Sequence, residues 1–381
     1  MSFLQIKDKV RAGEPLSFAD GVELFHHANL LDVGQLANEV RERLHGQRTY
    51  FNRNMHINAT NVCVANCRFC SFARLKAGDL GAYTLSLEEA WGRLRARIQA
   101  KDPITEIHIV NGLHDGLPFS YYTELLSGLK RISPAVHLKA FTAVEIFFFH
   151  QHYGLPVAEV LTRLRAAGLD SLPGGGAEIF APRVRRKLCD DKSDADQWLG
   201  VHRTAHQMGL RSNCTMLYGH IETIEERVDH LLRLRALQNE TGGFQTFIPL
   251  AFHADGNALK QLAPPTGVDD LRTFAVSRLL LHNIPHVKAY WIMLGLKTAQ
   301  TALWFGADDL DGTVQEERIY HMAGAETPQH LGVSDIVHLI QQAGRVPIER
   351  DTLYNVVAEG SALVSTKPFR RHLPQAAGTA S

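Results

Sequence analysis

The chain has 381 residues, and its 40 Lys and Arg balance its 40 Asp and Glu, so charge gives no indication of a nucleic-acid or membrane-surface partner. Residues 1–15 lack an apolar core of signal-peptide length, and no apolar run approaches the roughly 20 residues that span a bilayer. Three of the five cysteines cluster within residues 63–70, which is typical of a metal site in a reducing compartment and not of a disulfide framework. We therefore expect a soluble, cytoplasmic protein.

Helices are predicted for the first 50 residues. Ser17 is a suitable N-cap for a helix over 18–28, and apolar residues recur at helical spacing over 33–44. We expect residues 1–50 to form a helical cap that packs on the main body of the protein.

From residue 55 onward, short β-rich runs alternate with amphipathic helices. A helix is predicted over 87–100, where Ser86 and Glu89 form a capping box, and another over 157–167. Strands are predicted over 56–61, 106–111, 137–142, 169–172, 211–217, 244–250 and 286–294. This alternation predicts an α/β fold with a parallel sheet, and the number of units favours a TIM-like barrel over residues 51–310. We expect 311–366 to pack on the barrel and 367–381, which lack periodicity, to be disordered.

The most specific pattern in the chain is a loop that follows the first predicted strand. Cys63, Cys67 and Cys70 are spaced C-x₃-C-x₂-C, and thiolates suit iron–sulfur clusters and zinc. Three thiolates can hold three irons of a cubane cluster and leave the fourth iron open, and no fourth cysteine follows nearby. The alternatives are a zinc knuckle and a metal-free turn. Structural zinc needs four closed ligands, and the nearest further candidate, His56, lies within the predicted strand.

Other polar clusters have simpler explanations. Residues 174–176 are all glycine but lack the spacing of a phosphate loop, so they predict either a turn with positive φ or a turn that a ligand approaches closely. His202 and His206 stand four apart on a predicted helix, without the Glu of a zinc-protease motif, which favours a structural or substrate-facing role. Cys189 and Cys214 are most simply small buried side chains.

The cysteine loop, with Phe69 before Cys70, resembles that of the radical S-adenosylmethionine (SAM) enzymes, and the similarity extends across residues 50–360. A small group within these enzymes contains aminofutalosine synthase, the dehypoxanthine futalosine cyclase and the two halves of deazaflavin (FO) synthase. The segments that resemble this group are HINATN (56–61), KAFTAVE (139–145), LPGGGAEIF (172–180), TMLYGH (215–220), TGGF (241–244) and FIPL (247–250).

Four later segments look like the aminofutalosine synthase family in particular. They are KAYWIMLG (288–295), DLDGTV (309–314), IYHMAG (319–324) and VPIERDTLY (346–354). The cyclase and FO synthase patterns usually carry Ser-Trp where this chain has Tyr290 and Trp291.

The resemblance implies one 4Fe–4S cluster with an open iron, held by Cys63, Cys67 and Cys70, and SAM consumed as a co-substrate. It implies that the 5′-deoxyadenosyl radical adds to 3-(1-carboxyvinyloxy)benzoate and gives 6-amino-6-deoxyfutalosine, methionine and bicarbonate or CO₂, in menaquinone biosynthesis. The electron would come from a flavodoxin or ferredoxin, and we expect neither a nucleic-acid nor a membrane partner.

The resemblance and the strand ends also suggest which residues contact the ligands. For SAM the candidates are Phe69, Asn111, Gly112, Gly174, Gly175 and Glu178. The substrate carries two carboxylates, which call for cationic, imidazole or hydroxyl donors. Candidates for substrate binding or catalysis are His114, Glu145, Tyr218, His220, Arg278 and Lys288.

Two other functions remain open from the sequence. The cyclase and FO synthase use the same radical to abstract hydrogen, and so release 5′-deoxyadenosine. A non-catalytic iron–sulfur or zinc protein, which serves in electron transfer or scaffolding, is the alternative from another class.

Overall fold

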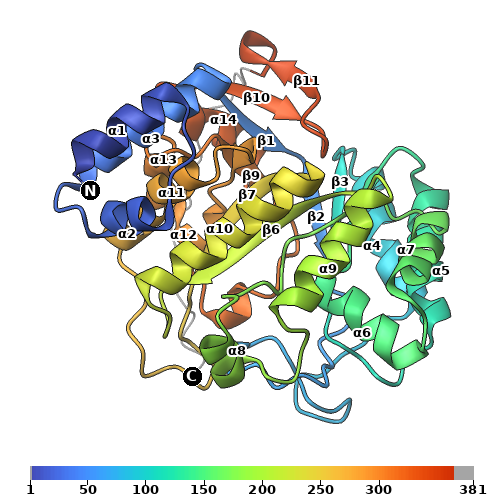
Figure 1. The fold of residues 1–381 in the computed structure, drawn as a ribbon. Coiled ribbons are helices and arrows are strands. Elements are labelled where there is room, and N and C mark those ends of the chain that lie inside the picture. The colour runs from blue at the N-terminus through green and yellow to red at the C-terminus, as the bar shows by residue number, and fades with distance from the viewer. Residues whose placement is uncertain (1, 364–381) are drawn as a thin grey trace, which may run out of the picture.

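The computed structural model describes residues 2–363, whose main body is a curled parallel sheet covered by helices (Figure 1). The sheet has seven strands, and their spatial order follows the chain from β2 to β8. They are β2 (Asn54–Ile57), β3 (Glu106–Ile109), β4 (His137–Ala140), β5 (Ser171–Leu172), β6 (Arg211–Tyr218), β7 (Phe244–Ala251) and β8 (His286–Val287). This arrangement confirms the predicted α/β fold with a TIM-like barrel and brings the C-terminal ends of the strands to one rim.

Amphipathic helices connect the strands. α4 (Leu87–Gln99) begins as predicted, because Ser86 Oγ accepts from Glu89 N and the Glu89 side chain accepts from Ser86 N at 2.7 Å. Ala90 and Leu94 are buried on the side of α4 that faces the core. The other barrel helices are α5 (Phe119–Ile132), α6 (Ala143–Tyr153), α7 (Val157–Ala166), α8 (Pro182–Leu188), α9 (Ala195–Gln207), α10 (Ile224–Thr241), α11 (Gly267–Leu280) and α13 (Leu296–Ala302).

The strand predicted over 286–294 is wrong beyond Val287. Residues Trp291–Leu294 form the short helix α12, which ends at Gly295 with φ +73°. The side chain of Trp291 is buried, and its Nε1 donates to Gly312 O at 2.9 Å. A short apolar run fits a buried strand and a buried helix equally well by periodicity, which explains the error.

Residues 308–315 fill the space between β8 and β2, the two edge strands of the sheet. On one side Ala289 N donates to Asp309 O at 2.8 Å, and on the other His56 N donates to Gln315 O at 2.8 Å. Isolated parallel bridges accompany both contacts. The segment therefore completes the barrel wall where the two edge strands do not pair with each other.

A second sheet joins both ends of the described chain, in the order β11-β10-β1-β9. Its strands are β1 (Arg48–Asn52), β9 (Asp309–Gly312), β10 (Val346–Arg350) and β11 (Val356–Glu359), and α14 (Val333–Gln342) precedes β10. β1 begins inside the segment that the sequence predicts to be helical. The predicted disordered tail, 367–381, lies outside the described residues.

Three helices precede β1; the second and third pack against α10 and α11, and the first packs on the other two (Figure 1). They are α1 (Phe3–Ala12), α2 (Phe18–His26), which has the predicted Ser17 N-cap, and α3 (Leu30–His45). Within residues 2–363, no helix has both the length and the apolar composition needed to cross a membrane.

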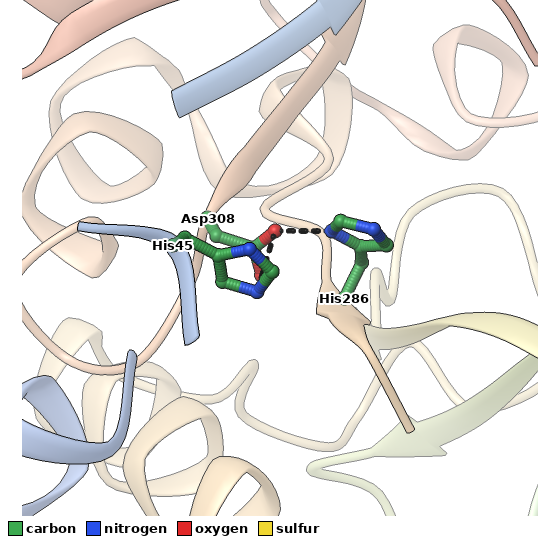
Figure 2. Close-up of side chains that lie close together, drawn as sticks. All are labelled: His45, His286 and Asp308. Carbon is green, nitrogen blue, oxygen red and sulfur yellow. Dashed lines mark hydrogen bonds and ion pairs between the residues drawn. The ribbon is translucent and has the colours of Figure 1, made fainter. Parts of the chain in front are cut away.

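A buried cluster of His45, Asp308 and His286 ties α3 to the barrel (Figure 2). Asp308 Oδ2 lies 2.6 Å from His286 Nδ1 and 3.5 Å from His45 Nε2, and Asp308 Oδ1 pairs with Arg278. Burial opposes ionisation of Asp308, but these three partners together lower its pKa well below the usual range. His45 Nε2 also donates to Pro285 O at 2.9 Å. Because Arg278 already balances the carboxylate, we assign the cluster a structural role.

Candidate active site in the barrel cavity

The three clustered cysteines lie on one wall of a cavity at the C-terminal rim of the barrel. Their loop follows β2 and is held by backbone hydrogen bonds, from Cys63 N to Arg74 O at 2.8 Å and from Val64 N to Leu113 O at 2.9 Å. Burial raises the pKa of the Cys63 and Cys70 thiols. Three soft ligands on one wall fit three irons of a cubane cluster, which would also stabilise the thiolates.

The cavity encloses about 1320 Å³ of empty space, its open mouth included. Seven of the residues predicted to contact SAM or the substrate line the same cavity: Phe69, Asn111, Gly112, Glu145, Gly174, Gly175 and Glu178. The structure thus brings the predicted SAM residues next to the cysteines. Their contact with SAM stays a prediction.

Two of these glycines are required by close backbone packing. A Cβ at Gly112 would lie 2.2 Å from Val62 O, directly before Cys63. A Cβ at Gly174 would lie 2.7 Å from the Cα of Cys214 on β6. Of the three consecutive glycines, only Gly176 has positive φ, at +85°. Close approach explains Gly112 and Gly174, and turn geometry explains Gly176.

Glu178 forms an ion pair with Lys192 inside the cavity. The Lys192 ammonium lies 5.2 Å from the centre of the Phe69 ring. Burial alone would lower the pKa of Lys192, but Glu178 and Cys67 outweigh this effect and raise it. Lys192 is therefore a fixed positive charge beside the cysteine loop. Lys192 could not be identified from the sequence, because it lies in the irregular segment between α8 and α9 and belongs to no motif.

Glu145 has a positioning role in the observed structure. Its Oε1 accepts from Asn111 N at 3.0 Å and from Asn111 Nδ2 at 3.2 Å, and its Oε2 accepts from Thr142 N and Oγ1. Burial raises the pKa of Glu145 to about 7, although all four hydrogen bonds oppose this shift. With both oxygens occupied, the carboxyl group joins the N-terminus of α6 to the end of β3, where Asn111 and Gly112 lie.

The five remaining substrate candidates do not line the cavity. Tyr218 Oη donates to Asp270 at 2.7 Å, and Lys288 pairs with Asp311 at 3.0 Å. Arg278 lies on helix α11 and belongs to the cluster around Asp308. The other two candidates are held by local contacts, since His114 Nδ1 accepts from Gly116 N and His220 contacts Leu217 O and Glu222. Their part in substrate binding stays a prediction, and each has a different partner in the structure.

The other histidine and cysteine candidates are structural. His202 Nδ1 and His206 Nε2 lie 2.9 and 2.7 Å from the same Ser212 hydroxyl. Cys189 and Cys214 are buried and neither lines the cavity. The contacts of these four residues therefore agree with structural roles.

Solved structures share this fold. Over 92% of this chain and 80% of its own, the FeFe-hydrogenase maturase HydG from Carboxydothermus hydrogenoformans superposes with a TM-score of 0.71 at 17% identity. Methylornithine synthase (PylB) gives a TM-score of 0.70 at 18% identity, over 89% of this chain and 96% of its own. At such low identity these similarities establish the fold alone.

The sequence comparisons define the class of protein. Residues 57–234 match the radical SAM superfamily, and residues 241–362 match the CofH/MqnC C-terminal region. Together with the barrel and the cysteine loop, these matches show that the chain is a radical SAM protein.

Relatives of high sequence identity indicate the family within this superfamily. An aminodeoxyfutalosine synthase of Thermus thermophilus is 50% identical over 93% of this chain and 95% of its own, and that of Streptomyces coelicolor is 47% identical over 97% of both chains. A 5-amino-6-(D-ribitylamino)uracil–L-tyrosine 4-hydroxyphenyl transferase of Methanopyrus kandleri is 40% identical over 85% of this chain and 89% of its own. The chain belongs to the aminodeoxyfutalosine synthase family of radical SAM enzymes.

Proposed function

We propose that the chain joins the 5′-deoxyadenosyl group of SAM to 3-(1-carboxyvinyloxy)benzoate and produces 6-amino-6-deoxyfutalosine. The observation that carries this proposal is a single cavity that combines the three-cysteine wall with the glycine-rich turn, in a chain 50% identical to an aminodeoxyfutalosine synthase. We also propose that the enzyme acts in the cytoplasm and receives its electron from a flavodoxin or ferredoxin.

Cys63, Cys67 and Cys70 would hold a 4Fe–4S cluster whose fourth iron stays open. When bound, the cluster would supply the electron that splits SAM into methionine and the 5′-deoxyadenosyl radical. The ion pair of Lys192 with Glu178 places one charge of each sign beside the cysteines, and both charges suit the polar groups of SAM.

The carbon radical adds to the methylene carbon of the enol ether, and the new radical attacks the ring carbon that carries the ether oxygen. The bond between that oxygen and the ring then breaks. The oxygen becomes the ketone as the neighbouring carboxyl group leaves as CO₂ and gives up one electron. This electron replaces the one consumed in SAM cleavage, so the overall reaction is redox-neutral. The chain contributes by excluding water and by holding the enol ether against the ring. Holding the reacting carbons together raises their effective concentration, which is the main way a protein can accelerate such an addition.

Mass spectrometry of a single anaerobic reaction tests the proposal. The reconstituted protein receives dithionite, SAM and 3-(1-carboxyvinyloxy)benzoate, and the expected product contains the adenosyl group joined to the benzoate skeleton. Formation of only 5′-deoxyadenosine and methionine would refute the substrate and leave the radical SAM class intact. A Cys67→Ser variant serves as the control that lacks one cluster ligand.

A second candidate function is radical-mediated hydrogen abstraction, as in the cyclase or FO synthase. The 40% identity to a 4-hydroxyphenyl transferase supports it, whereas the Tyr290–Trp291 pair favours the first candidate. If the adduct does not form, dehypoxanthine futalosine is the next substrate to offer, followed by tyrosine with the ribitylaminouracil.

A further inference from the structure

One wall of the cavity carries polar residues that the account above does not use. His56 on β2 and His108 on β3 stand opposite each other in the parallel register, and their rings stack with centroids 4.7 Å apart. Tyr290 follows β8, and all three residues line the same cavity as the cysteines. His108 precedes Asn111 by three residues along the chain, so the histidine pair lies deeper in the barrel than Asn111, by at most about 10 Å at 3.3 Å per residue.

Several polar atoms that line this cavity have no partner. His56 is 7% exposed, Tyr290 6% and Asn213 3%. His56 Nε2, Tyr290 Oη and Asn213 Oδ1 are buried without a hydrogen bond to any described residue. Buried polar atoms are nearly always hydrogen-bonded, to protein, water or ligand, because leaving them unpaired is costly. All three residues line the same cavity, which points to a polar ligand inside it.

The charged neighbours of these residues are already paired. Asp311 lies 3.0 Å from Lys288, and beneath the histidines Glu106 lies 2.9 Å from Lys139. Glu317 accepts from the backbone N of Tyr320 and lies 3.0 Å from His321 Nδ1. The imidazoles and the phenol are therefore unpaired donors that face the cavity, and they match a group that accepts several hydrogen bonds.

The geometry of the proposed reaction identifies that group. The methylene carbon of the enol ether must meet the carbon released from SAM, which lies on the cysteine side of the cavity. Because the ring carboxylate is meta to the ether oxygen, it can extend away from the cysteines toward the histidine pair. This carboxylate is retained in the product, so a site that holds it from start to finish does not obstruct the loss of the other one.

We propose that His56, His108 and Tyr290 bind the ring carboxylate of the substrate and thereby aim its enol ether at SAM, an inference that rests on the proposed function. The imidazole N–H groups and the Tyr290 hydroxyl donate to the carboxylate oxygens. These residues are positioning residues, since none of them touches the atoms that react.

A cycle of variants and ligands tests the site with the cluster-loaded protein. The ligands are 3-(1-carboxyvinyloxy)benzoate and the analogue with hydrogen in place of the ring carboxylate, and the variants are Tyr290→Phe, His56→Gln and His108→Gln. Each variant should weaken binding of the dicarboxylate about 10- to 100-fold, the range for a lost hydrogen bond to a charged group, and change binding of the analogue little. Tyr122→Phe, which removes a buried phenol that does not line the cavity, is the matched control.

If a variant loses the same affinity for both ligands, or keeps its affinity for both, the proposed carboxylate site is refuted. Equilibrium binding and product formation are both measured, so that the two proposals fail separately. If the wild-type protein makes the adduct and the variants bind the dicarboxylate normally, the carboxylate site alone is refuted. If the wild-type protein neither binds nor converts the dicarboxylate, the proposed function and the site are both refuted. Tyr290→Phe removes one oxygen atom only, so it keeps the test valid if a histidine variant does not fold.

Discussion

A methyl group at Gly112 should disable the cysteine loop while leaving the barrel folded. In Gly112→Ala the new Cβ would lie 2.2 Å from Val62 O, whereas an ordinary contact is about 3.5 Å, so the two backbones must separate by about 1.3 Å. Gly112 N donates to Thr60 O at 2.9 Å, so the displacement passes directly into the segment that leads to Cys63. A misplacement of 1 Å in an active site can cost about 100-fold in rate, and overpacking costs about 1–3 kcal/mol in stability.

The assay compares iron and sulfide content, the rate of SAM cleavage and thermal unfolding in the variant and the wild-type protein. We expect a SAM cleavage rate about 100-fold lower, with a loss of stability of no more than about 3 kcal/mol. Gly92→Ala on α4 is the control, because a Cβ there has nothing within 4 Å and alanine favours a helix by about 0.5–1 kcal/mol. A Gly112→Ala protein with wild-type cluster content and cleavage rate would refute the argument from backbone contact.

Three further outcomes follow from buried charges and thiols. Lys192→Met leaves Glu178 unpaired beside the cysteines, so the KM for SAM should rise at least about 10-fold; an unchanged KM in initial-rate measurements would contradict a role for this pair. Asp308→Asn should reduce the free energy of unfolding by about 3–5 kcal/mol in urea titrations, because a buried guanidinium loses its counter-charge, and a loss below about 1 kcal/mol would disprove this. The pKa of Asp308 is lowered in the fold, so its stabilisation is complete above the ordinary value of 3.8 and declines as the pH falls below it, a dependence that the Asn variant should lack. Cys67→Ser should lose the visible absorbance of the cluster and Cys189→Ser should keep it; equal losses would place Cys189 among the ligands.

Much of the barrel was predictable because its elements obey local rules. The capping residues Ser17 and Ser86 set two helix starts, and alternation of strands with helices determined a parallel sheet in chain order. β1 was not predictable in the same way, since four of its five residues are buried and no alternation marks one face. α12 was mistaken for a strand because four apolar residues carry too little periodicity to decide.

The candidate site was predictable to the extent that function is encoded in contiguous sequence. The cysteine spacing, the strand ends and the family resemblance together predicted ten residues that line one cavity. A strand end, however, does not reveal which side a residue faces: Tyr218 turns to Asp270, while His56 and His108 face the cavity. The position of Lys192 in the cavity depends on the path of the loop between α8 and α9, and this path is determined only when the chain folds.

The segment that completes the barrel wall has a consequence for synthesis on the ribosome. Asn54 N donates to Thr313 Oγ1 at 3.2 Å, and the two residues are 259 positions apart. At a synthesis rate of about 5–20 residues per second, the outer edge of β2 stays unpaired for roughly 13–50 s before residue 313 is made. During that interval an unpaired strand edge is open to association with other chains. Slow elongation or truncation before residue 308 should therefore favour aggregation, even though the cysteine loop and most of the barrel are already made.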